Sequence, residues 1–160
     1  MQTLSKLKSK LPLIISAAIV LATLAALFVF SGQDSEESNQ VSGVVVDFVM
    51  KLFNMSDDTE TVNTVTLVVR KLAHFTIFAV LGASLYAFTS SLLLLRPYIS
   101  TLIIGLCAAI INELQQLTSE GRTASIRDVA IDFSGVVVGS LIVWGIVRWV
   151  QNRRKIKKDC

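Results

Sequence analysis

The residues best suited to chemistry in this chain are ionisable groups that interrupt long apolar runs. His74, Glu113 and Asp132 each fall within such a run. A carboxylate at the centre of a membrane helix costs about 2.5 kcal/mol or more, so it usually faces protein or water and marks a functional site. We predict three catalytic residues: His74 and Glu113 transfer protons, and Asp132 orients His74 or an incoming nucleophile.

A second set of polar residues is suited to hold a substrate. Arginine forks match phosphate oxygens, lysine adds a further cation, and side-chain amides hydrogen-bond polar headgroups. The predicted substrate-binding residues are Gln33, Arg70, Lys71, Asn112, Gln116, Arg122 and Asp128.

Helical spacing places several of these groups on shared faces. Residues four apart lie one above the other on a helix. The pairs with this spacing are Arg70 with His74, Asn112 with Gln116, and Asp128 with Asp132. A buried carboxylate needs a partner, so we expect the three faces to converge in one pocket.

Four predicted transmembrane helices must position these groups. Each apolar run is close to the roughly 20 residues that cross a bilayer, and only a helix satisfies its own backbone in lipid. We expect the spans at about 11–30, 72–95, 98–117 and 129–150. The predicted fold is all-α, a polytopic membrane protein with a four-transmembrane-helix bundle, as one domain over residues 1–160.

The charge distribution supports this fold and predicts its orientation. Charged residues make up 17 % of the chain and the net charge is +3, but the basic residues flank the apolar runs, which argues against nucleic acid as a partner. Lysines before the first span, Arg96 and the basic tail 151–160 fall on one side of a four-span bundle, which predicts cytoplasmic termini and an outward-facing site. The first span is longer than the roughly 7 to 15 apolar residues at the centre of a signal peptide, so we expect an uncleaved anchor. The alternative is a cleaved signal peptide, with Val29 and Ser31 at the −3 and −1 positions of the cleavage site.

The segment between spans one and two predicts an extracytoplasmic amphipathic helix, lying on the membrane or capping the bundle. Its apolar residues recur at helical spacing: Val41, Val44, Val45, Phe48, Val49 and Leu52. Thr61 to Val69 should then lead helically into span two.

Local motifs predict how the fourth span begins and packs. Ser125 followed by Asp128 resembles a capping box that starts a helix at about Ile126. Gly135 and Gly139 form a G-x-x-x-G step, which favours close helix packing.

No cofactor is predicted from the sequence. Cys107 and Cys160 are poorly placed to pair, and the single histidine has no recognisable metal-ligand motif. The oxygens of Glu113, Asp128 and Asp132 allow a divalent cation without requiring one.

Four motifs together resemble the VanZ-like family. They are Phe-Ser-Gly-Gln at 30–33 with serines up to 42, Arg-Lys-Leu-Ala-His-Phe at 70–75, Asn-Glu-Leu-Gln-Gln at 112–116, and Glu-Gly-Arg with Ile-Arg-Asp-Val-Ala-Ile-Asp-Phe-Ser-Gly over 120–135. Asn112 departs from the family pattern, in which Asp commonly precedes the Glu. The resemblance implies a multi-pass protein of the bacterial plasma membrane, linked to low-level resistance to the glycopeptide teicoplanin. The family is also distantly similar to membrane enzymes that remodel lipid headgroups.

Three functions remain open at this stage. The first is an enzyme that modifies a lipid or lipid-linked headgroup at the outer leaflet by phosphoester or glycan chemistry. The second is a non-catalytic binder of a lipid-linked cell-wall precursor or lipopeptide, and the third is a small transporter. A structural alternative is an ion-pair network of Glu113, Asp132, Arg122 and Arg70 that only holds the bundle together.

Overall fold

The computed structural model shows a helical chain. It describes residues 2–31, 35–92, 94–118 and 125–159, with side chains described over 11–31, 43–92, 94–118 and 125–153. Within these residues there are five helices and no strand. The helices are α1 (Gln2–Ser31), α2 (Ser35–Leu52), α3 (Thr59–Ser91), α4 (Pro97–Gln116) and α5 (Ile126–Asp159). The predicted all-α class is confirmed.

Four of these helices are long and apolar enough to cross a membrane. The segments are Leu11–Ser31, Thr59–Ser91, Pro97–Gln116 and Ile126–Arg153. Large apolar side chains such as Leu21, Ile103 and Trp149 face outward, with exposed fractions of 68, 59 and 61 %. Many of the buried side chains are polar instead. Lipid as the surrounding solvent explains this distribution, and the chain is a multi-pass membrane protein.

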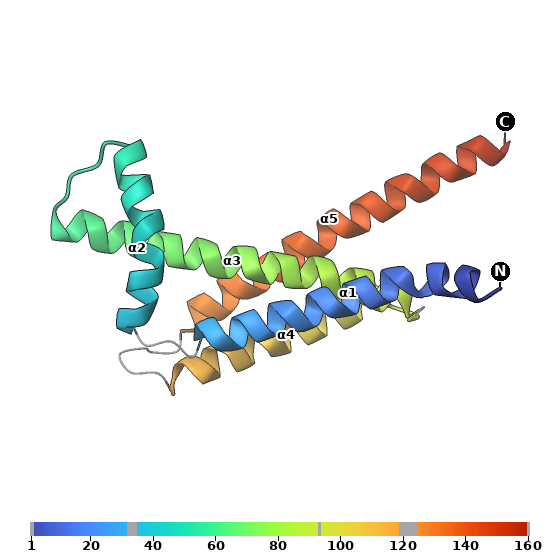
Figure 1. Cartoon of the computed structure of the whole chain (residues 1–160), viewed down its shortest axis with the longest axis horizontal. Helices are drawn as coiled ribbons and strands as arrows, with labels where there is room; N and C mark the ends of the chain where they lie inside the picture. Colours follow the sequence, from blue (N-terminus) through green and yellow to red (C-terminus); the bar gives the residue numbers. More distant parts are fainter. Residues whose placement is uncertain (1, 32–34, 93, 119–124, 160) are drawn as a thin grey trace.

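Helix α3 is the centre of the bundle, in contact with each of the other four helices. Figure 1 shows α1, α3 and α4 running together along the long axis while α5 crosses them obliquely. The start of α1 and the end of α5 lie at one end of this axis, called here the termini end. Helix α2 lies across the opposite end, called the α2 end.

Glycines let α3 and α5 approach until their backbones touch. A Cβ atom on Gly139 would lie 1.8 Å from the carbonyl oxygen of Ala79, and one on Gly135 would lie 2.4 Å from that of Phe75. On the α3 side, a Cβ on Gly82 would lie 2.2 Å from a backbone oxygen of α5. The predicted close packing through the G-x-x-x-G step is confirmed.

Helix α2 has two apolar faces rather than the single stripe expected from its sequence. Val46 and Met50 are buried against Val65, in the part of α3 that precedes the predicted span. Most of the predicted stripe instead faces outward, including Val44, Val45, Phe48 and Leu52, while the side chain of Val41 lies outside the described residues. One face of α2 thus packs on the first turns of α3. The other apolar face of α2 stays exposed, because its apolar residues cover more than one face.

The helix boundaries differ from the predicted spans at the termini end. Helix α3 ends at Ser91 rather than continuing to residue 95, and α4 begins at Pro97. Proline is favoured at the first position of a helix, where its missing N–H is not needed. Thr89 and Thr101 join the two helices through a hydroxyl hydrogen bond of 2.9 Å. Helix α5 extends beyond residue 150 to Asp159.

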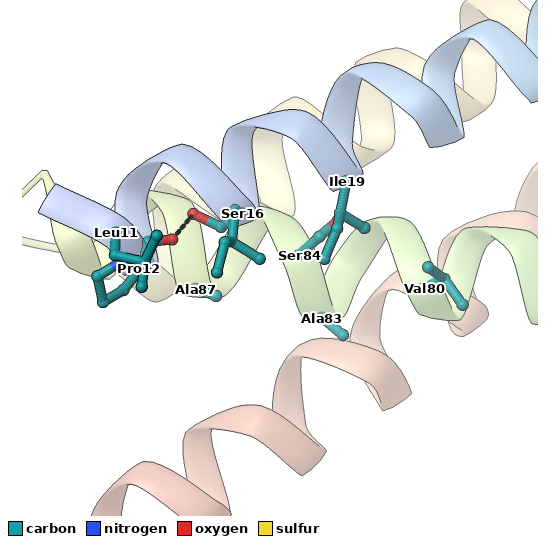
Figure 2. Close-up of a pocket in the computed structure, with 9 residues that line it drawn as sticks. Leu11, Pro12, Ser16, Ile19, Val80, Ala83, Ser84 and Ala87 are labelled. Atoms are coloured by element: carbon teal, nitrogen blue, oxygen red, sulfur yellow. Dashed lines mark hydrogen bonds between the residues drawn. The ribbon is translucent and has the colours of Figure 1, made fainter. Parts of the chain in front are cut away.

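An apolar cavity of about 560 Å³ lies between α1 and α3 (Figure 2). The small side chains Ala83 and Ala87 leave space on the α3 side. The two serines in its wall are already satisfied, since Ser16 donates to the Pro12 carbonyl at 2.8 Å and Ser84 donates to a carbonyl of its own helix. The cavity therefore offers little polar chemistry.

Candidate functional site

A buried chain of hydrogen bonds links three helices toward the α2 end. The Asn112 amide Nδ2 on α4 donates to Asp132 Oδ2 on α5 at 3.1 Å. Ser31, the last residue of α1, donates its hydroxyl to Asn112 Oδ1. The exposed fractions of Ser31, Asn112 and Asp132 are 0, 4 and 1 %. Asn112 thus acts as donor and acceptor at once, and it satisfies one oxygen of a buried carboxylate.

The second oxygen of Asp132 faces His74 on α3. Asp132 Oδ1 lies 3.7 Å from His74 Nδ1, and the histidine side chain is 23 % exposed. This contact is longer than a hydrogen bond, but a carboxylate this close to a histidine suits a group that exchanges protons. The structure therefore brings the predicted His74 and Asp132 together.

Glu113 is buried beside the start of α5. Its side chain is 3 % exposed, and its Oε2 accepts the backbone N–H of Ser125 at 2.9 Å. Ser125 directly precedes α5, whose first amides carry partial positive charge. The start of α5 thus holds the Glu113 side chain in place. The carboxylate lies at the N-terminus of this helix, where negative charge is stabilised.

The start of α5 confirms one part of the capping prediction and corrects another. The helix begins at Ile126, as expected. Ser125 Oγ, however, accepts from the Arg127 amide at 3.2 Å, and the Asp128 carboxylate pairs with Lys71 of α3. The reciprocal capping box does not form, because Glu113 takes the amide that Asp128 was expected to take.

The Lys71–Asp128 ion pair crosses from α3 to α5 near the buried cluster. Its two side chains are 45 and 33 % exposed. Exposed ion pairs contribute about 0–1 kcal/mol, so this pair positions charge more than it stabilises the fold. No spacing rule connects residues on different helices, so this particular pairing could not be predicted from the sequence.

The structure shows fewer contacts for the remaining predicted binding residues. Arg70 is partly exposed and, among the described side chains, forms no ion pair. Gln116 is buried with an exposed fraction of 9 %, one turn beyond Asn112. Gln33 and Arg122 lie outside the described residues.

Ser31 is not among the predicted site residues, although it belongs to the Phe-Ser-Gly-Gln motif at 30–33. A second α1–α4 link is also new: Gln115 Nε2 donates to the Phe28 carbonyl at 2.8 Å. In the described part of the chain, no three histidine, cysteine, aspartate or glutamate side chains come together as a metal ion would need.

Comparison with known proteins places this arrangement in a family. No curated protein and no solved structure matches the chain. A model of the VanZ/LLP1 family matches residues 16–148. That range contains Ser31, Asn112 and Asp132 of the cluster and every predicted site residue. The chain therefore belongs to the VanZ/LLP1 family.

Proposed function

We propose that this protein modifies a lipid or lipid-linked headgroup at the outer leaflet of the bacterial plasma membrane. The observation that carries the proposal is the contact of 3.7 Å between His74 Nδ1 and the buried Asp132 carboxylate. A histidine oriented in this way, partly exposed and inside an apolar span, is suited to general acid–base catalysis. The cations of Lys71 and Arg70 lie three and four residues before it on the same helix.

The proposed reaction is phosphoester exchange or hydrolysis. Arg70, Lys71 and Arg122 hold the headgroup phosphate. His74 takes the proton from a water or alcohol as its oxygen attacks phosphorus, and the bond to the leaving oxygen breaks. His74 then returns the proton to that oxygen, so the enzyme ends in its starting state. Asp132 stabilises the imidazolium that exists between the two transfers.

The proposal also includes the orientation of the protein in the membrane and its effect on teicoplanin resistance. Basic residues flank the termini end, so the positive-inside rule assigns that end to the cytoplasm and the α2 end to the outside. A changed headgroup or lipid-linked precursor at the outer surface would alter the access of teicoplanin to its target.

A teicoplanin sensitivity assay separates catalysis from binding. We expect His74→Ala to abolish the effect of the protein on sensitivity at wild-type abundance in the membrane. A passive binder tolerates loss of one partly exposed imidazole, so an unchanged effect in His74→Ala would overturn the catalytic proposal. Lys51→Ala, an exposed substitution on α2, is the matched surface control.

A further inference from the structure

A second cavity, of about 660 Å³, lies at the termini end of the bundle, far from the His74 cluster. The end of α3, the start of α4 and the second half of α5 line it. Two arginines from different elements line it: Arg96 in the α3–α4 turn and Arg148 on α5. None of its lining residues is acidic. Its volume falls within the roughly 300–1,000 Å³ of ligand pockets.

Aromatic rings from three helices line this cavity, and one of them stacks on one of its cations. The Arg148 guanidinium lies over the Trp144 ring, 5.7 Å from the ring centroid. Tyr86 and Tyr98 meet edge to face, with ring centroids 6.2 Å apart. A guanidinium held against a ring loses less conformational entropy when it binds a ligand. Arg148 is therefore preorganised to bind an anion.

The cavity also contains an unsatisfied polar atom. Ser90 Oγ is buried in its wall and has no hydrogen-bond partner among the described residues. The serines beside the α1–α3 cavity differ, since Ser16 donates to the Pro12 carbonyl (Figure 2) and Ser84 donates to another carbonyl of its own helix. The cavity at the termini end therefore differs from the α1–α3 cavity in its polar and basic lining.

We infer that this cavity binds an anionic phosphate group, such as an anionic phospholipid headgroup or free phosphate carries. Two arginine forks supply the geometry that phosphate oxygens prefer. Basic pockets between transmembrane helices are suited to anionic headgroups, and the aromatic wall suits the level of the membrane interface. This binding does not depend on the proposed chemistry, because the His74 cluster lies toward the opposite end of the bundle.

Arg153 provides the matched control. Its guanidinium also stacks on a tryptophan of α5, 5.2 Å from the centroid of the Trp149 ring. Arg153 does not line the cavity, although it lies only five residues beyond Arg148. If the arginines merely anchor the helix end to a charged membrane, Arg153 should matter as much as Arg148.

The test uses the purified full-length chain in nanodiscs of phosphatidylcholine doped with phosphatidylglycerol. Native mass spectrometry counts the phosphatidylglycerol that remains bound after release. We expect Arg96→Gln and Arg148→Gln each to weaken retention about tenfold, the effect of losing one charge-assisted hydrogen-bonding group. Arg153→Gln should stay within about twofold of wild type. A wild-type melting temperature in pure phosphatidylcholine nanodiscs checks that each variant is folded.

The outcomes separate the alternatives. Retention that falls in Arg96→Gln and Arg148→Gln only supports the site with lipid as its source. If inorganic phosphate displaces phosphatidylglycerol and raises the melting temperature of wild type but not of the two variants, the site is supported with free phosphate as a second source. Equal losses in all three variants, or none in any, would overturn the inference. None of these outcomes decides the proposed function, which the teicoplanin sensitivity assay tests separately.

Discussion

Asn112 of α4 donates its side-chain amide to the Asp132 carboxylate of α5 over 3.1 Å, in a buried position where it also accepts from Ser31. This pairing gives a physical meaning to the departure from the VanZ-like pattern. An ionised aspartate at this position would only accept hydrogen bonds and would place a second carboxylate against Asp132. Asparagine accepts from Ser31 and donates to Asp132, so the amide links three helices without adding charge.

The first prediction concerns this link. Asn112→Asp should lower the free energy of unfolding by about 1–3 kcal/mol, because it removes the donor from a buried acceptor. Ser31→Ala should cost about 0.5–1.5 kcal/mol. Denaturant unfolding in detergent micelles measures both. Asn63→Asp on the exposed start of α3 is the control and should change stability by less than about 0.5 kcal/mol. Wild-type stability in Asn112→Asp would show that the hydrogen bond contributes nothing.

Glu113 can be tested separately as a structural and as a chemical group. Glutamine at this position retains an oxygen that can accept the Ser125 amide, so Glu113→Gln should lose less stability than Glu113→Ala. Glu113→Ala leaves that amide without its acceptor and should cost about 1–3 kcal/mol. If Glu113 transfers a proton, Glu113→Gln should nevertheless lose about 10²–10⁴-fold in activity. Full function in Glu113→Gln, measured by teicoplanin sensitivity at matched abundance, would assign Glu113 a purely structural role.

The contact between α3 and α5 should be sensitive to one methyl group. Gly139→Ala places a Cβ where the Ala79 carbonyl oxygen lies 1.8 Å away, so the helices must separate. We expect a loss of about 1–3 kcal/mol, as for other overpacked interiors, together with weaker function because His74 and Asp132 sit on these two helices. Gly145→Ala on the same helix meets nothing within 4 Å and should not destabilise the protein. Equal thermal stability of both variants would contradict the packing described here.

The start of α3 should depend on pH through Asp58. Its carboxylate accepts from Ser56 Oγ at 2.5 Å, and from the Thr61 amide at 2.9 Å and hydroxyl at 2.7 Å. The Ser56 bond first, then those from Thr61, hold the pKa of Asp58 below its ordinary value. A depressed pKa in the folded state means that the cap stabilises α3 above the ordinary aspartate pKa and is lost only as pH falls through the lower, folded value.

Hydrogen exchange at the Thr61 amide measures this dependence. Protection should persist as pH falls below about 3.9, the ordinary aspartate pKa, and decline at still lower pH. Asp58→Asn keeps a capping side chain that does not titrate, so its protection should show no such decline. Loss of wild-type protection already between pH 5 and 4 would contradict the account.

The sequence predicts the fold better than the site. Apolar runs of membrane length identify four spans, and Gly135 with Gly139 correctly indicates a close helix contact. The helical lead from Thr61 into span two is confirmed, but the far end of this helix is less accurate, since α3 ends at Ser91 rather than at residue 95. Length and hydropathy cannot distinguish a helix within lipid from one that continues into water.

Within the site, spacing along one helix is predictive but contacts between helices are not. The shared faces of α3, α4 and α5 follow from residues four apart, and His74, Asn112 and Asp132 do converge. Which partner each group chooses depends on helix rotation and depth, which no local pattern encodes. Asp128 therefore pairs with Lys71 of another helix rather than completing a capping box.

Comparative lipidomics, including lipid-linked precursors, tests the central claim most directly. Cells with wild-type protein, with His74→Ala at equal membrane abundance and with empty vector would be compared. We expect one headgroup or precursor species to change with wild-type protein alone, which would also identify the substrate class. Identical profiles in all three, with teicoplanin sensitivity still altered by both wild type and His74→Ala, would contradict catalysis and assign the protein to passive binding.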